Sequence, residues 1–200
     1  MSIASTLPSF PAFAPPSQRL LTAADLALLP TSLSTGDVRY ELDNGRLVIM
    51  PPPGDMHGDF SHRMSVQFHL EGELRGLGKA RGEVGIVLRR NPDRVVGADA
   101  AFILKASLPV RRSPEGYLET IPEIVVEVKS KNESAMELTA KAAEYFDAGV
   151  KEVWILDPMA RSLAVHGADG SVWVCREPEI LRSPLLPGFA LPLERLFDDS

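Results

Sequence analysis

The sequence predicts a mixed α/β fold in which a central sheet of parallel and antiparallel strands is flanked by helices. One observation is a strand–helix–strand unit over residues 123–156, whose connection is long enough for a right-handed parallel crossover. The other is a series of short strand patterns separated by turns over residues 40–104, which is typical of antiparallel meanders. The length of 200 residues predicts one domain with a proper core.

The N-terminal part of the chain begins with a segment that has no regular hydrophobic pattern. Residues 1–18 are rich in Pro, Ser and Ala and predict a flexible leader, so we expect residues 19–200 to form the single domain. Residues 22–25 match a capping box, with Asp in the fourth position. A short helix running to about Leu29, ahead of Pro30, is therefore predicted.

Hydrophobic periodicity and turn residues predict the remaining elements. Apolar residues spaced by about 3.6 predict a helix over 56–77, and a second pattern predicts a helix over 133–148 that ends at Gly149. Asp43-Asn44-Gly45 predicts a hairpin turn, because Asn-Gly favours positive φ. The predicted strands are rich in β-branched and aromatic residues and cover 40–42, 46–50, 83–88, 95–104, 123–128, 152–156, 162–166 and 171–175.

The composition is that of an ordinary globular protein without disulfides. A single cysteine, Cys175, cannot form an internal disulfide, which fits a reducing cytoplasm and excludes a cysteine-rich zinc site. No apolar run approaches the ~20 residues of a membrane span, and prolines interrupt any signal-peptide core near the N-terminus. The net charge of -6 argues against a protein that coats nucleic acid, but not against a nuclease, whose site is often acidic until metal binds.

Two charges interrupt the apolar strand over residues 123–128. Glu127 and Lys129 are two positions apart, so their side chains project from the same face of a strand, while Ile124, Val126 and Val128 project from the other. Burying an unpaired charge is costly, so the two side chains need partners. The pair is either a simple ion pair at a strand end or part of a metal site with an adjacent cation.

Asp99 adds a second acid, in the otherwise apolar strand over residues 95–104. If this strand lies beside the one that carries Glu127, both carboxylates converge with Lys129. Two hard oxygen ligands with open positions suit Mg²⁺ or Mn²⁺, which acidify bound water and neutralise a phosphoryl oxygen. The order Asp, a gap of a few tens of residues and Glu-x-Lys is the pattern of the PD-(D/E)XK nuclease superfamily.

Further motifs connect the chain to a known family. The most distinctive runs over residues 148–158 and contains Ala-Gly-Val followed by Glu-x-Trp. The other matching residues are 40–42, 45–47, 50–53, His57, Asp99, 122–128, Ser130, Lys141, Tyr145 and 186–189. On these residues, nearly the whole chain from Tyr40 to Phe197 resembles the Uma-two family of restriction-endonuclease-like proteins.

The resemblance implies a PD-(D/E)XK fold and a Mg²⁺-dependent endonuclease that acts on DNA. It also implies that Asp99 and Glu127 are metal ligands, with the carbonyl of Val128 as a third. The chain departs from the family pattern at Ala98 and Lys131, which stand where prolines are common, and at Lys129.

Two lysines are candidates for the catalytic cation. Lys129 occupies a position that the family often fills with an apolar residue, so the Glu-x-Lys pattern is intact in this chain. Lys141, on the following helix, also matches a family position. We expect Lys129 to be the catalytic cation because strand geometry puts it beside Glu127. Lys141 is then either a second cation or a surface partner of Glu137.

Three other residues are candidates for the site, each with an alternative. Glu41 either completes a metal shell or is an exposed strand acid. His57 either acts near the substrate phosphate or is a partly exposed histidine at a helix start, and Lys131 is assigned with it to substrate binding. Tyr145 and Trp154 are expected in the core.

The sequence leaves three candidate functions. The first is a Mg²⁺-dependent phosphodiesterase acting on DNA, which the set of two acids and a lysine favours. The second is a nucleic-acid- or protein-binding module that keeps the fold without turnover, and the third is a metal-dependent enzyme on another phosphate ester. A homodimer is compatible with the first function, because double-strand cleavage often pairs two sites by two-fold symmetry.

Overall fold

The computed structural model describes residues 19–34, 36–111, 116–131 and 133–198, so the leader expected over residues 1–18 lies outside the described residues. In this part of the chain an eight-stranded sheet has the order β10-β9-β8-β7-β6-β3-β4, and β5 pairs with β6. Its strands are β3 (Arg39–Asp43), β4 (Arg46–Met50), β5 (Gly78–Arg89), β6 (Arg94–Leu104), β7 (Ile124–Val128), β8 (Glu152–Asp157), β9 (Ser162–Gly167) and β10 (Val172–Arg176). The predicted mixed α/β sheet is therefore confirmed.

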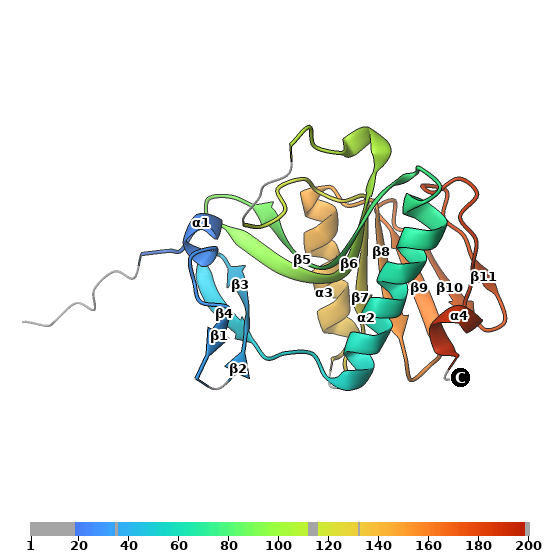
Figure 1. The fold of residues 1–200 in the computed structure, drawn as a ribbon, viewed down its shortest axis with the longest axis horizontal. Helices are drawn as coiled ribbons and strands as arrows, with labels where there is room; N and C mark the ends of the chain where they lie inside the picture. The colour runs from blue at the N-terminus through green and yellow to red at the C-terminus, as the bar shows by residue number, and fades with distance from the viewer. Residues whose placement is uncertain (1–18, 35, 112–115, 132, 199–200) are drawn as a thin grey trace, which may run out of the picture.

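Helices cover both faces of this sheet (Figure 1). Helix α2 (Asp55–Phe68) contributes Phe60, Met64 and Phe68 to one buried cluster, in which the rings of Phe68 and Trp154 lie 5.2 Å apart. Helix α3 (Ala135–Ala148) contributes Leu138, Ala142 and Tyr145 to a second cluster on the opposite face. Smaller elements complete the described chain: α1 (Ala23–Leu26), β1 (Ser32–Leu33), β2 (Gly36–Asp37), β11 (Ile180–Leu181), β12 (Leu191–Pro192) and α4 (Glu194–Phe197).

The predicted parallel crossover is β7, α3 and β8. Strand β7 pairs with β8 in parallel, and Glu127 lies opposite Ile155. Helix α3 starts at a capping box formed by Ser134 and Glu137, and it ends at Gly149, whose φ of 110° suits glycine. The sequence placed these boundaries within about two residues because caps and a C-terminal glycine are local features.

The expectations for residues 56–88 are wrong in extent. Helix α2 ends at Phe68 and continues as a π-helical turn over His69–Glu73, whereas the sequence predicted a helix to residue 77. Strand β5 begins at Gly78 instead of residue 83. A Cβ at Gly78 would lie 2.1 Å from the carbonyl oxygen of Ile103, so this glycine permits the close pairing with β6.

Strand β6 changes its neighbour and its buried face near Asp99. It pairs with β3 at Val95 and with β7 from Ala100 to Phe102. Ala98 packs in the cluster under α3, but Ala100 packs in the cluster under α2, although strict alternation would put both on one face. The buried side chains of β6 therefore change sheet face at Asp99, between the segment that pairs with β3 and the segment that pairs with β7.

Candidate active site

A cavity of about 340 Å³ lies where β3, β6 and β7 meet the N-terminus of α2. Its lining includes six residues that the sequence singled out: Glu41, His57, Asp99, Glu127, Val128 and Lys141. We call it the site cavity. Residues far apart in the sequence meet here because β6 separates from β3 before it joins β7.

Asp99 connects two strands and a helix through its two carboxylate oxygens. Oδ2 accepts a hydrogen bond from the backbone N–H of Val128 at 2.7 Å, which ties β6 to β7. Oδ1 accepts from Nε2 of His57 at 2.8 Å, which ties β6 to the first turns of α2. With 6% of its surface exposed, Asp99 is fixed at the bottom of the site cavity.

Glu127 is a buried carboxylate that α3 holds at both oxygens. Nζ of Lys141 lies 2.6 Å from Oε2, and the hydroxyl of Tyr145 donates to Oε1 at 2.5 Å. Burial raises the pKa of Glu127 to about 7; the charge of Lys141 opposes this shift, and the charge of Asp99 adds to it. Near neutral pH the charge of Glu127 therefore depends on its burial and on the charges of Lys141 and Asp99.

Lys129 pairs with Asp157 rather than with Glu127, so the contact expected from the sequence is wrong. Its Nζ lies 2.6 Å from Oδ2 of Asp157. Strand alternation does put Lys129 on the face of Glu127, but the parallel register sets Glu127 against Ile155 and leaves Asp157 beside the lysine. The cation beside Glu127 is Lys141, which is therefore not a surface partner of Glu137.

His57 lies on the wall of the site cavity at the start of α2. Nε2 donates to Asp99, and Nδ1 lies 3.3 Å from the hydroxyl oxygen of Ser130. The hydrogen bond to Asp99 raises the pKa of His57, although burial alone would lower it. His57 is therefore a partly exposed histidine at the start of the helix, and it also holds the candidate ligand Asp99.

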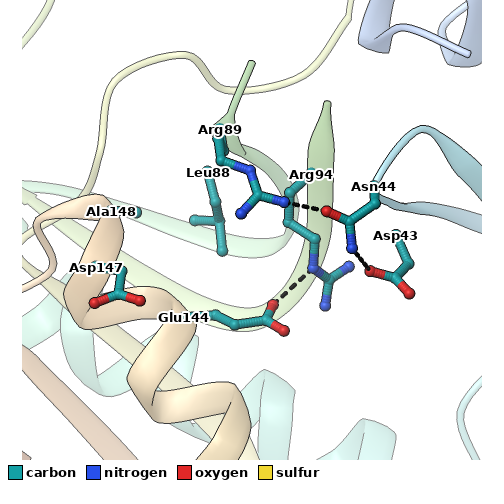
Figure 2. Close-up of a pocket in the computed structure, with 8 residues that line it drawn as sticks. All are labelled: Asp43, Asn44, Leu88, Arg89, Arg94, Glu144, Asp147 and Ala148. Atoms are coloured by element: carbon teal, nitrogen blue, oxygen red, sulfur yellow. Dashed lines mark hydrogen bonds and ion pairs between the residues drawn. The ribbon is translucent and has the colours of Figure 1, made fainter. Parts of the chain in front are cut away.

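Glu41 lies on β3 in the lining of the site cavity and forms an ion pair with Arg94. Oε1 accepts from the backbone N–H of Gly97 at 2.9 Å, and Oε2 lies 3.4 Å from Nη1 of Arg94. Figure 2 shows Arg94 in a neighbouring pocket, where its Nε donates to Glu144 of α3 at 2.6 Å. Glu41 is thus a partly buried, anchored carboxylate rather than an exposed strand acid.

Lys131 differs from the other candidates because it is exposed and lies outside the lining of the site cavity. Its neighbours Ser130 and Glu133 do line the cavity. Lys131 therefore lies beside the site cavity and not in its lining.

Sequence reasoning missed the roles of two side chains in this geometry. Tyr145 was expected in the core, where it lies, but its hydroxyl also contacts Glu127. Arg94 is not among the candidates named from the sequence, although it anchors Glu41. A signal for Tyr145 existed: Lys141 and Tyr145 are four positions apart on a predicted helix, so they share a face.

Comparisons with known proteins give the family and the fold of this chain. A family model, Uma2, described as “Putative restriction endonuclease”, matches residues 23–194. The chain belongs to the Uma2 family. A crystal structure from Anabaena variabilis ATCC 29413, of “a putative nuclease belonging to DUF820”, aligns with a TM-score of 0.69 at 17% identity and covers 88% of this chain and 97% of that chain. No curated protein matches the chain.

Membership of Uma2 confirms the resemblance seen in the sequence, and the aligned crystal structure confirms the fold. The family description identifies a restriction-endonuclease-like nuclease. None of the helices in the described residues is long and apolar enough to span a membrane.

The donors of the Uma2 site cavity fit a hard divalent cation. Asp99 and Glu127 supply carboxylate oxygens, and proteins hold Mg²⁺ with one or two carboxylates while waters and substrate phosphates complete the shell. Within the described ranges, no group of three or more His, Cys, Asp or Glu side chains could hold a metal by itself. The two carboxylates therefore fit a divalent ion whose remaining positions are filled by water or substrate.

Proposed function

We propose that this Uma2 protein is a metal-dependent endonuclease that hydrolyses phosphodiester bonds of DNA, with Asp99 and Glu127 as metal ligands. The observation that carries the proposal is the convergence of two buried carboxylates, from neighbouring strands, in one cavity with a lysine on one of them. Buried charges of this kind are costly for a fold, so their retention at a cavity favours a functional site over a structural one.

Each residue of the site has a role under this proposal. Asp99 and Glu127 bind Mg²⁺ or Mn²⁺, and the carbonyl of Val128 and the carboxylate of Glu41 offer further oxygens. The bound ion lowers the pKa of a water molecule and offsets charge on the phosphoryl group. Lys141 favours the ionised form of Glu127 and brings positive charge to the cavity, where it stabilises the charge that develops during attack.

The substrate side of the site cavity has fewer assigned residues. His57 holds Asp99 and lies at the cavity wall, so it is within reach of a phosphate bound there. Lys131 contacts the phosphate backbone at the rim, as a positioning contact without sequence information. A homodimer would bring two such sites to the two strands of a duplex.

One observation favours a second candidate, a binding module without turnover. All four carboxylate oxygens of Asp99 and Glu127 already contact protein donors: His57, Val128, Lys141 and Tyr145. Such a network is stable by itself, as in a protein that retains a buried polar cluster for structure. A carboxylate has about four lone-pair sites, however, so each oxygen still has capacity for a ligand.

A cleavage assay tests the proposal directly. The purified protein is incubated with single- and double-stranded DNA and Mg²⁺ or Mn²⁺, beside Glu127→Gln, Lys141→Met and Lys129→Met. We expect cleavage by the wild type, loss of at least 100-fold in the first two variants, and much smaller loss in Lys129→Met. Cleavage that survives in Glu127→Gln would reject the assigned site.

A matched lysine variant controls for the loss of an ion pair as such. Lys79 also lies 2.6 Å from a glutamate, Glu73, but outside the site cavity. Lys79→Met should cleave like the wild type. If no substrate is cleaved while DNA is still bound, the binding module is the better description.

A further inference from the structure

Helix α3 presents two polar side chains, one turn apart, to the same carboxylate. Lys141 and Tyr145 are four positions apart, which places them on one face of the helix. Each takes a different oxygen of Glu127: Lys141 lies at Oε2 and Tyr145 at Oε1. Helix α3 thus contacts both oxygens of the carboxylate, and each oxygen keeps lone-pair capacity for a further ligand.

Hydrophobic packing does not account for the hydroxyl of Tyr145. The side chain is fully buried in the apolar cluster with Leu138, Ala142 and Val125, where a phenylalanine ring would fill the same volume. A buried hydroxyl costs free energy unless it has a partner. Its partner in this structure is a candidate metal ligand, which distinguishes Tyr145 from an ordinary core tyrosine.

The same strand ties the two candidate ligands together. Asp99 accepts the N–H of Val128, the residue that follows Glu127, so the backbone of β7 fixes Asp99 relative to Glu127. That backbone bond does not fix the rotation of the Glu127 carboxylate, which has three side-chain torsions of its own. The contacts at its two oxygens must therefore set the direction in which Glu127 offers its free lone pairs.

We propose that Tyr145 is a positioning residue that orients the Glu127 carboxylate for a divalent metal ion. The inference rests on the proposed function, because it requires a metal in the site cavity. Partners behind a metal ligand fix its orientation, and their loss commonly lowers metal affinity 10–100-fold. Tyr145 acts through Glu127 and contacts neither substrate nor the reacting atoms.

The test measures Mn²⁺ binding by calorimetry without DNA. Tyr145→Phe removes one oxygen and keeps the ring, so we expect it to weaken Mn²⁺ binding about tenfold or more. Tyr117→Phe is the matched control: Tyr117 is outside the site cavity, with its ring against Gly85, and its variant should bind like the wild type. Equal Mn²⁺ affinity in Tyr145→Phe and wild type overturns the inference and leaves the proposed function standing.

The cleavage rate measured at increasing Mn²⁺ concentration distinguishes a positioning role of Tyr145 from damage to the fold. If Tyr145 orients a ligand, Tyr145→Phe needs more metal but regains nearly the wild-type rate at saturation. A rate that stays low at saturating metal overturns the inference. No Mn²⁺ binding by the wild type overturns the proposed function and this inference with it.

A measurement on the unmutated fold covers the case in which Tyr145→Phe does not fold. The protein is labelled with fluorotyrosine, and its fluorine NMR spectrum is recorded with and without Mg²⁺. We expect the Tyr145 signal to shift on addition of Mg²⁺, because the metal draws charge from the carboxylate that accepts its hydrogen bond. The Tyr117 signal should stay in place, and an unmoved Tyr145 signal at saturating Mg²⁺ would contradict the assignment.

Discussion

Metal binding by the site cavity should strengthen about tenfold between pH 6 and pH 8. Glu127 has a pKa raised to about 7, so it is neutral in most molecules below that pH. For a group with this pKa, the ionised fraction is about 9% at pH 6, about half at pH 7 and about 91% at pH 8. A carboxyl must lose its proton to bind a metal, so apparent affinity follows the ionised fraction and then levels off.

The groups that face Glu127 set the form of this dependence. Lys141 stays charged throughout, because Glu127 raises its pKa although burial would lower it, and Tyr145 stays protonated because burial raises its pKa well above 10. Asp99 lies close enough for its charge to raise the pKa of Glu127. The hydrogen bond to Asp99 raises the pKa of His57, so a metal ion that replaced this bond at Asp99 would also favour loss of the His57 proton.

Calorimetric titration with Mn²⁺ at half-unit steps from pH 5.5 to 8.5, at constant ionic strength, measures this effect. The logarithm of the affinity should rise with a slope that approaches one well below pH 7 and flattens above pH 8, which amounts to about tenfold between pH 6 and pH 8. In His57→Asn this dependence on Glu127 should remain. An affinity that is constant between pH 6 and pH 8, or that rises only near pH 4.5, would refute the raised pKa of Glu127.

Three stability predictions follow from other contacts. Lys141→Met should lose about 3–5 kcal/mol in urea unfolding at pH 8, because it leaves Glu127 buried without its cation. Lys79→Met, in a pair that is less buried, should lose about 1 kcal/mol; equal losses would contradict this. Glu152 is buried against the indole N–H of Trp154, and burial raises its pKa, so its contribution to stability is lost as pH rises through that pKa. Glu152→Gln should gain relative to wild type from pH 4 to pH 8 in thermal melts, and a constant difference would argue against it. Gly149→Ala should cost about 1–2 kcal/mol in urea unfolding, because φ is 110°, and an unchanged midpoint would show that the cap relaxes.

The two candidate ligands could be predicted from the sequence because charge in an apolar strand is anomalous wherever it occurs. Asp99 and Glu127 interrupt runs of buried residues, and such acids require partners or a ligand. Their proximity followed once the strands were taken as neighbours, and β6 does pair with β7. The local pattern therefore identified both acids without knowledge of the packing.

The cation could not be predicted in the same way. Alternation along a strand gives the face of Lys129 but not its partner, and the parallel register with β8 supplied Asp157 instead. Lys141 reaches Glu127 because of the position of α3 along the strands of the sheet. That position depends on tertiary packing of the apolar cluster, for which a single sequence carries no direct signal.

The first half of β5 could also not be predicted from the hydrophobic pattern of the sequence. Residues 78–82 alternate small and basic side chains, so they do not match the apolar pattern of a half-buried strand. Their pairing with β6 depends on long-range contacts and on the close approach at Gly78. Helical periodicity in the preceding segment then extended the predicted helix too far.

The pairing of β5 with β6 also limits which changes in length the protein can tolerate during evolution. A strand that slips by one residue turns every side chain to the opposite face. One residue inserted between Val95 and Asp99 would thus turn Asp99 away from His57 and Val128, even if the sheet still formed. The turn over residues 90–93 is constrained as well, because the buried carboxylate of Asp93 accepts the backbone N–H of Ala23, so variation in length should be excluded from residues 90–99.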